Sequence, residues 1–419
     1  MLKSLNIKRL FSSLDGYQKA EYMTLLLWAV AIPLSWKLAL KALALFALAT
    51  IIRFCHEKIR KTYSRPAHHS RLNTIAYLLS IGFFAIYLIS IAYSSNTTEA
   101  WSNVNKKMAF AIAPVLFLVS NLYYLTRDHI RLVLHLFSAT LIVRFLFFLI
   151  RALNCLITRG AFPLDEFFDP LHHTYLALYT LLALAFLYTE LVDYARGSRR
   201  TLLAVLGMMV LLVAYIIITQ SRTGLVGLIL LIGGILIHLV FVQKRIWLGI
   251  ITIAAIIIGA GGVYILQPDT SHRLTNTIKG LAQGNSSDDR LVITQTALQT
   301  IGENLPWGVG VGDRIDELQV RFKQNTSDQA IIDRHFNPHN QFLDTLLSTG
   351  VIGLLVLLSL VAIPFFVKKR DNVYLLLFIS ITAFCALFES ILERQMGIQF
   401  FCLFYCLLLV DTKEGTPID

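Results

Sequence analysis

Long apolar stretches separated by short clusters of charged residues run through almost the whole sequence, and they limit what the chain can fold into. A helix needs about 20 apolar residues to cross the hydrocarbon core of a membrane. Hydrophobic residues make up 56% of the 419-residue chain and charged residues 15%. A soluble domain has about 45–50% and about 25%. These values exclude an ordinary soluble enzyme, a disordered chain and a fibrous repeat, and they predict an all-α polytopic membrane protein.

Twelve apolar stretches lie between the charged clusters, and each is a candidate transmembrane helix. They cover residues 21–36, 38–54, 73–93, 107–125, 132–155, 173–193, 201–219, 225–242, 246–266, 341–367, 373–390 and 396–411. The first two are short and are joined by a tight turn at residues 35–37. We therefore expect about 12 transmembrane helices.

The distribution of Lys and Arg predicts the orientation of these spans. The chain carries 37 Lys and Arg against 26 Asp and Glu, a net charge of +11. The basic residues gather at the N-terminus and in alternate connections, near residues 3–9, 53–71, 127–131, 196–200, 244–245 and 368–370. Cytoplasmic connections carry such an excess, so both termini are expected in the cytoplasm. Lys106 and Lys107 are exceptions on the opposite side. Because the charges form short clusters between spans, no nucleic-acid partner is expected.

One connection, residues 267–340, is far longer than the others. It holds seven Lys and Arg against nine Asp and Glu, so its net charge is negative and we expect it on the periplasmic or extracellular side. Long loops in compact proteins are usually functional, and part of this one has helical periodicity. The predicted organisation is spans 1–9 in residues 1–266, this large loop in 267–340, spans 10–12 in 341–411, and a short cytoplasmic tail in 412–419.

A histidine stands at the end of the large loop. The segment Asn337-Pro338-His339-Asn340 precedes the tenth span, which puts His339 at the periplasmic membrane surface. Histidine is the side chain whose ordinary pKa lets it accept a proton near neutral pH, so His339 is the candidate catalytic residue. The alternative is an interfacial histidine that only anchors a helix start. Gly350 and Gly353 follow within the span, where small residues permit close helix packing.

Two arginines are expected on the same side of the membrane. Arg222 lies in a short turn between the seventh and eighth spans, and Arg290 lies in the large loop. Positive charge is disfavoured there, so each arginine should have a partner. A planar guanidinium suits bidentate binding of phosphate or pyrophosphate. The alternatives are a snorkelling side chain for Arg222 and a salt bridge to Asp288 or Asp289 for Arg290.

Further polar residues lie close to the predicted spans and are secondary candidates. His172 marks the entry to the sixth span, where it could line a sugar site or anchor the helix. Glu389, Glu393 and Arg394 lie at the connection between the last two spans. Charges at membrane depth are costly unless they are paired, so the acids could pair with Arg394 or with another basic group.

No metal or nucleotide site is expected. The chain has no Walker A sequence, and the glycine-rich run 308–312 follows no predicted strand, which favours a flexible turn over a phosphate-binding loop. His335 and His339 have the spacing of zinc ligands. However, Pro338 separates them and no third ligand is near in the sequence, so we expect neither a metal ion nor a cofactor.

The region around His339 resembles the signature of the O-antigen ligases and their polymerase relatives, bacterial membrane glycosyltransferases of the C-type superfamily. That signature is a histidine, then Asn, Ser or Gln, nine residues, and Gly-x-x-Gly. The chain has His339-Asn340, residues 341–349 and Gly350-Val351-Ile352-Gly353, at the end of a long loop as in the family. The stretches 221–224 and 290–308 are also similar, and the resemblance covers about residues 200–400.

The resemblance implies transfer of a polysaccharide from undecaprenyl pyrophosphate to an acceptor hydroxyl on the periplasmic face of the inner membrane. In ligases the acceptor is a sugar of lipid A–core. His339 would be the general base, Arg222 and Arg290 would bind the donor pyrophosphate, and His172 and Asn340 would be secondary contacts. Because the sugar arrives activated, the family uses neither nucleotide nor metal. A single displacement would invert the anomeric centre.

Three functions remain open from the sequence. The first is the ligase, with lipid A–core as acceptor. The second is an O-antigen or exopolysaccharide polymerase, with the same lipid-linked donor and a growing glycan as acceptor, or its variant that glycosylates protein. The third is a transporter for the lipid-linked glycan, which should show internal repeats and broken helices near the membrane midplane. The complete histidine motif and the absence of visible repeats favour the ligase.

Overall fold

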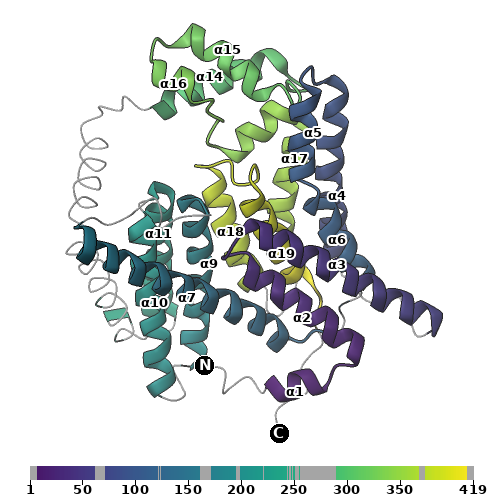
Figure 1. Ribbon diagram of the computed structural model, residues 1–419, viewed down its shortest axis with the longest axis vertical. Helices are drawn as coiled ribbons and strands as arrows, with labels where there is room; N and C mark the ends of the chain where they lie inside the picture. The colour runs from purple at the N-terminus through teal and green to yellow at the C-terminus, as the bar shows by residue number, and fades with distance from the viewer. Residues whose placement is uncertain are drawn as a thin grey trace. The chain divides into compact units, whose positions relative to one another are not determined.

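The computed structural model describes most of the chain, and its longest undescribed segment is 255–288. The described residues are 7–61, 71–120, 122, 124–160, 171–194, 199–219, 221–242, 244, 247, 249–250, 254, 289–367 and 373–412. Helices make up the regular secondary structure of this part of the chain (Figure 1). The expected span at 246–266 and the first part of the predicted large loop lie largely outside the described residues.

Seven of the described helices are long and apolar enough to cross a membrane. They are α3 (Trp36–Ile59), α4 (Arg71–Ser90), α7 (Arg127–Arg159), α9 (His173–Tyr194), α10 (Arg199–Thr219), α11 (Arg222–Ile237) and α17 (Gln341–Phe366). The short η1 (Ile91–Tyr93) extends α4, and η2 (His238–Val242) follows α11. These helices coincide with predicted spans, so the chain is a multi-pass membrane protein.

Four shorter helices also coincide with predicted spans. They are α2 (Gly16–Ala31), α6 (Ala109–Ser120), α18 (Val373–Ala386) and α19 (Gln395–Leu409). None reaches the length of about 20 residues that a perpendicular crossing requires, and Pro114 lies inside α6. The structure therefore places helices at these four apolar stretches, but it does not establish that each one is a complete span.

The first of two compact units contains residues 1–49, 124–278 and 412–419. It comprises α1 (Ile7–Ser12), α2, the start of α3, α7, α9, α10 and α11. The central helix of this unit is α9, which packs against α7, α10 and α11. A partly buried ion pair joins α7 to α9: the Arg131 guanidinium contacts both carboxylate oxygens of Glu190, with Nε–Oε1 at 2.9 Å and Nη2–Oε2 at 2.7 Å.

The second unit contains residues 50–123 and 279–411. Its elements include α4, α5 (Thr97–Lys106), α6, α14 (Asp289–Asn304), α15 (Arg314–Asn325), α16 (Gln329–Asp333), α17, α18 and α19. Helix α4 packs against α6 and α17, while α19 packs against α6 and α18. Because every residue of α19 from Gly397 to Leu409 is buried, α19 forms the core of this unit.

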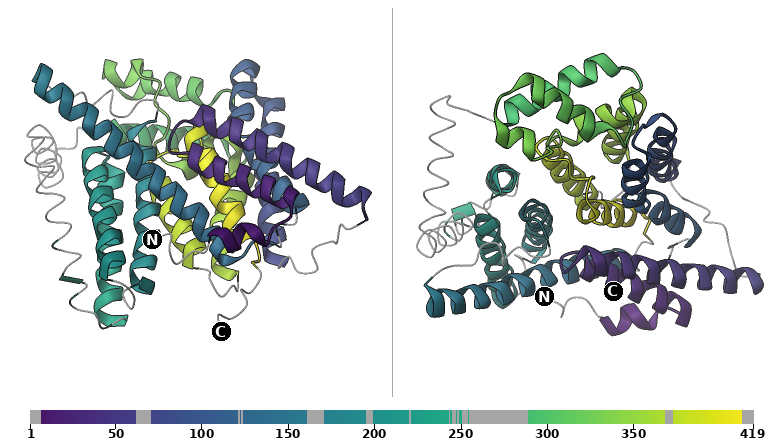
Figure 2. Two further views of the ribbon diagram at one scale, coloured as in Figure 1. Left: turned by 60° about the horizontal axis from the view of Figure 1, so that its bottom comes forward. Right: turned by 45° about the horizontal axis from the view of Figure 1, so that its top comes forward.

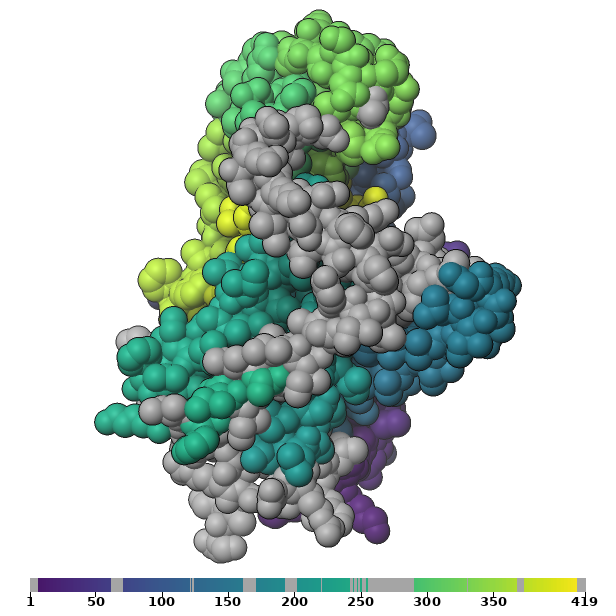
Figure 3. All heavy atoms as spheres, turned by 90° about the vertical axis from the view of Figure 1, so that its left-hand side faces the viewer, coloured from purple at the N-terminus to yellow at the C-terminus, as the bar shows by residue number. Residues whose placement is uncertain are grey.

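Helices α14, α15 and α16 fold together before α17 begins, and we call residues 289–340 the lobe. Its apolar core consists of Ile293, Ala297, Ile301, Leu318, Phe322 and Ile331, together with Leu347 of α17. Figures 1 and 2 show the three helices side by side next to the first turns of α17, and the space-filling view in Figure 3 shows them as one compact green mass. The described part of the predicted large loop is therefore a folded structure attached to α17.

Candidate functional site

His339 lies at the end of the lobe, two residues before α17 begins, and its backbone is held in an unusual conformation. Its φ is +47°, in the left-handed region that few non-glycine residues adopt. The His339 N–H donates to Asn337 Oδ1 at 3.0 Å. Asn340 then caps α17, because its Oδ1 accepts the N–H groups of Phe342 at 2.9 Å and Leu343 at 3.1 Å. These hydrogen bonds therefore hold the backbone on both sides of His339 in place.

The imidazole of His339 contacts a carboxylate from another segment of the same unit. His339 Nδ1 lies 3.2 Å from Glu389 Oε1, and the two side chains are 27% and 16% exposed. Asn340 Nδ2 also donates to the carbonyl of Leu387 at 3.1 Å, which fastens this second segment beside the histidine. With Nδ1 donating its proton to Glu389, Nε2 has a lone pair free to accept one.

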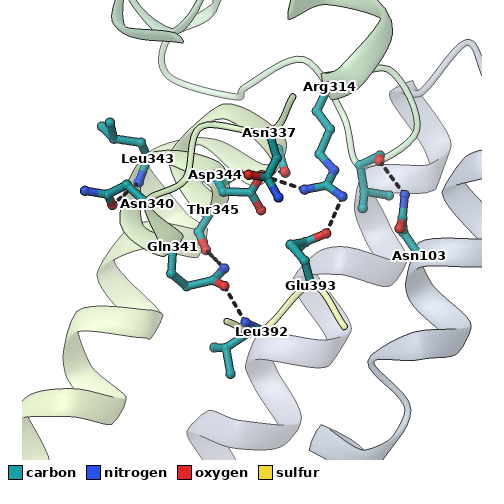
Figure 4. A network of polar contacts seen from close by, with 12 residues as sticks. Asn103, Arg314, Asn337, Asn340, Gln341, Leu343, Asp344, Thr345, Leu392 and Glu393 are labelled. Carbon is teal, nitrogen blue, oxygen red and sulfur yellow. Dashed lines mark hydrogen bonds and ion pairs between the residues drawn. The ribbon is translucent and has the colours of Figure 1, made fainter. Parts of the chain in front are cut away.

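A network of four buried charges lies beneath the same turn. The Arg314 guanidinium stands between two carboxylates, with Nη1 at 2.5 Å from Asp344 Oδ1 and Nη2 in contact with Glu393 Oε2 (Figure 4). The Lys107 ammonium completes the network at 2.7 Å from Glu393 Oε1. Two cations thus balance two anions, which is the condition under which charges tolerate burial.

The environment of Glu393 keeps it ionised. Burial alone would raise the pKa of this carboxyl, but Arg314 and Lys107 lower it to about 2. The Lys107 ammonium also lies over the ring of Tyr87, 4.5 Å from its centroid. Glu393 therefore stays ionised near neutral pH, and its ion pairs with Arg314 and Lys107 join separate segments of the chain.

The glycine-rich run, expected to be a flexible turn, instead crosses α17 in close contact. We call residues 306–313 the strap. Helix α17 breaks at Gly350, where φ is +67° and ψ is −161°, a combination almost restricted to glycine. Three backbone hydrogen bonds join the broken helix to the strap: Val309 N to Leu347 O at 2.8 Å, Gly310 N to Ser348 O at 3.1 Å, and Val351 N to Pro306 O at 2.9 Å.

The opposite side of the strap is bound just as tightly. The carboxylate of Asp313 accepts the N–H groups of Ser95 and Asn96, both at 2.6 Å. The N–H of Gly312 donates to Ser94 Oγ at 3.1 Å. The strap thus connects α17 to the segment between η1 and α5. A Cβ on Gly350 would meet the backbone of Trp307 at 2.5 Å, so the glycine that we expected to pack against a helix packs against the strap.

The predicted pyrophosphate-binding arginines belong to different units. Arg290 lies in the first turn of α14, is half-buried, and forms no salt bridge among residues 289–367 and 373–412. Arg222 is the first residue of α11 and is exposed. Ser221 caps that helix by accepting the N–H of Gly224 at 3.1 Å. Arg290 therefore shares a unit with His339, whereas Arg222 is described within the first unit.

The secondary candidates have structural partners. In the first unit, His172 Nδ1 accepts the N–H of Thr174 at 3.4 Å, and its ring lies 4.0 Å from that of His173. In the second unit, Glu393 pairs with Lys107 and Arg314 and not with the adjacent Arg394, which is exposed at the start of α19. Among the described residues, no group of three or more His, Cys, Asp or Glu side chains could hold a metal ion.

Sequence reasoning did not find Arg314 or Asp344. Arg314 does not stand out locally, because it is one of several charged residues of the large loop. Asp344 did carry a signal, since an acid inside an apolar span needs a partner. Lys107 did carry a signal: a basic residue on the side of the membrane where Lys and Arg are disfavoured needs a partner. That partner is Glu393, 286 positions further along the chain.

Replacing Gly350 by alanine tests the junction between strap and helix. Gly350→Ala should lower the unfolding temperature in detergent, since the new Cβ meets the strap and the backbone conformation costs about 1–3 kcal/mol for a residue other than glycine. Gly302→Ala is the matched control, because nothing lies within 4 Å of its added Cβ. The control should unfold at or slightly above the wild-type temperature. Equal unfolding temperatures for Gly350→Ala and the wild type would contradict this account of the junction.

A part of the chain that includes His339 matches a known protein family. Residues 207–358 match the family described as O-antigen ligase, whereas no curated protein matches the chain. The matched residues include Arg222, Arg290, His339 and the break at Gly350, but they end before Glu389 and Glu393. Residues 207–358 therefore carry the sequence pattern of the O-antigen ligase family, and this match supports the resemblance seen around His339.

Proposed function

We propose that the protein is an O-antigen ligase. It transfers a polysaccharide from undecaprenyl pyrophosphate to a sugar hydroxyl of lipid A–core, on the periplasmic side of the bacterial inner membrane. The proposal includes about 12 spans, cytoplasmic termini and a periplasmic loop at 267–340. The family match and the seven apolar helices support a membrane enzyme of the ligase and polymerase type.

The observation that carries the proposal is the contact between His339 and Glu389 beside the folded lobe. A carboxylate that accepts the Nδ1 proton at 3.2 Å holds the imidazole in the tautomer whose Nε2 can take up a proton. His339 remains partly exposed, so an acceptor hydroxyl can approach Nε2. Both conditions are those of a general base.

In the reaction, His339 Nε2 removes the proton of the acceptor hydroxyl while its oxygen attacks the anomeric carbon of the donor glycan. The bond between that carbon and the pyrophosphate oxygen breaks, and undecaprenyl pyrophosphate leaves with the electron pair. Arg222 and Arg290 are proposed to bind the pyrophosphate and stabilise its growing charge. One displacement inverts the anomeric centre. The energy comes from the donor's own pyrophosphate bond, so ATP and metal ions have no role in the proposal.

His339 and His335 offer a matched pair of substitutions. Both residues have positive φ, +47° and +49°, and asparagine tolerates that conformation better than alanine. His339→Asn should lower transfer by about 10²–10⁴-fold, the range for loss of a general base. His335→Asn should remain close to wild type. The assay uses purified protein, undecaprenyl-pyrophosphate glycan as donor and lipid A–core as acceptor.

The product of the wild-type assay separates the ligase from its alternatives. Glycan attached to lipid A–core, lost in His339→Asn and retained in His335→Asn, is the expected result. Glycan that lengthens without joining the core would identify a polymerase that uses the same donor. If the wild type transfers to neither acceptor, the enzyme proposal fails and transport of the lipid-linked glycan becomes the better hypothesis.

Arg290→Lys tests the proposed pyrophosphate contact. An ammonium keeps the charge but cannot form two parallel hydrogen bonds, so transfer should fall by about 10²-fold, as for loss of one transition-state donor. Arg334→Lys, at an exposed position of the same lobe, should be close to wild type. Near-normal transfer by Arg290→Lys would remove Arg290 from the site.

Glu389→Gln tests the carboxylate beside His339. An amide can no longer hold the imidazole as an anion does, so kcat should fall by about 10-fold or more, with KM nearly unchanged because the substrate contacts remain. Glu317→Gln, at an exposed position of α15, is the control. A rise in KM at constant kcat would instead assign Glu389 to substrate binding.

A further inference from the structure

Helix α17 has two halves with different surfaces, and they meet at Gly350. In the half from Gln341 to Thr349 the polar side chains are buried and none of the apolar side chains is exposed. Beyond Gly350 the exposed residues are large and apolar: Ile352 (52% exposed), Leu355 (57%), Leu358 (44%), Phe365 (54%) and Phe366 (68%). Such a surface is stable against lipid chains and unfavourable in water. The edge of the hydrocarbon core therefore lies close to Gly350.

The strap and the residue just before it bring two exposed apolar side chains to this level. Because Val351 N donates to Pro306 O at 2.9 Å, the strap begins beside the break in α17. The neighbouring side chains of Trp307 and Leu305 are 65% and 49% exposed. Large apolar side chains that form a contiguous patch are rarely exposed to water in a soluble protein.

A tyrosine from a third segment reaches the same place. Tyr93 ends the apolar helix that begins with α4, is 42% exposed, and donates its hydroxyl proton to the Trp307 carbonyl at 3.2 Å. Leu88 and Ile89, just before it, are exposed apolar residues. The three side chains thus continue the apolar surface of two candidate spans, α4 and α17, at the point where both surfaces end.

We propose that Tyr93, Leu305 and Trp307 form an interfacial anchor that inserts into the outer lipid surface at the level of Gly350. Tryptophan and tyrosine favour the boundary between acyl chains and headgroups, because each has a large apolar ring and a polar group that can remain hydrated. The partner is the lipid bilayer. The strap transmits the position of this anchor to the lobe through its hydrogen bonds to α17.

The anchor fixes the height of His339, a consequence that rests on the proposed function. The nine residues from Gln341 to Thr349 rise by 1.5 Å each in a helix, so His339 stands at most about 14 Å above the hydrocarbon edge. Headgroups and the water next to them occupy this zone. The pyrophosphate of a lipid-linked donor lies there too, so the anchor holds the proposed base at the depth of the bond to be broken.

Lipids that quench fluorescence at known depths test the anchor without requiring turnover. Trp307 is retained as the single tryptophan, with Trp28, Trp36, Trp101 and Trp247 replaced by phenylalanine, and the protein is placed in vesicles of brominated phosphatidylcholine. Bromine near the headgroup end of the acyl chain should quench Trp307 more strongly than bromine near its methyl end. Aqueous iodide should quench it weakly.

Trp101 provides the matched control. It is 52% exposed, but the other exposed residues of α5 are polar, so a single-Trp101 protein should respond to iodide and not to brominated lipid. If Trp307 behaves as Trp101 does, the anchor is disproved. Should the multiply substituted protein fail to fold, Trp307→Phe in the otherwise native chain must remove a lipid-quenched part of the emission; an unchanged response to brominated lipid would also disprove it. Loss of transferase activity would not affect either readout, so this test is independent of the proposed function.

Discussion

The structure of the second unit depends on one constraint: each buried backbone N–H and C=O group needs a hydrogen-bond partner. A broken helix leaves N–H and C=O groups without partners, and each costs several kcal/mol where water is absent. Gly350 breaks α17, and the strap bonds to the freed groups of Leu347, Ser348 and Val351. The lobe is thus attached to α17 at the break. The break also sets the direction of the first half of α17, which begins just after His339.

The four buried charges give this attachment its specificity. Arg314 is the first residue of α15, Asp344 lies in the first turn of α17, Lys107 caps the end of α5, and Glu393 lies in the connection before α19. Removal of one partner would leave a buried charge uncompensated, at a cost of about 3–5 kcal/mol. The network ties these four segments together, and Glu393 lies four residues after Glu389, which contacts His339.

The sequence predicted those features that depend on neighbouring residues. An apolar stretch of span length is recognisable by itself, so α3, α7, α9, α10 and α17 lie where we expected helices. The motif at His339 could likewise be read from adjacent residues. The strap and the pair Lys107–Glu393 depend on contacts between distant segments, which periodicity does not record. For this reason the sequence predicted that Gly350 packs against a helix, whereas the structure places the strap there.

The ends of the family match have a consequence for how the protein can be divided. Residues 207–358 begin in one compact unit and end in the other, and they contain Arg314 and Asp344 without Glu393 or Lys107. A fragment cut at these boundaries would leave a buried guanidinium without one of its two carboxylates, and the histidine would lose Glu389. The matched segment therefore does not coincide with either compact unit of the fold. The buried network and the contact to His339 are complete only with residues from outside the match, Lys107 before it and Glu389 and Glu393 after it.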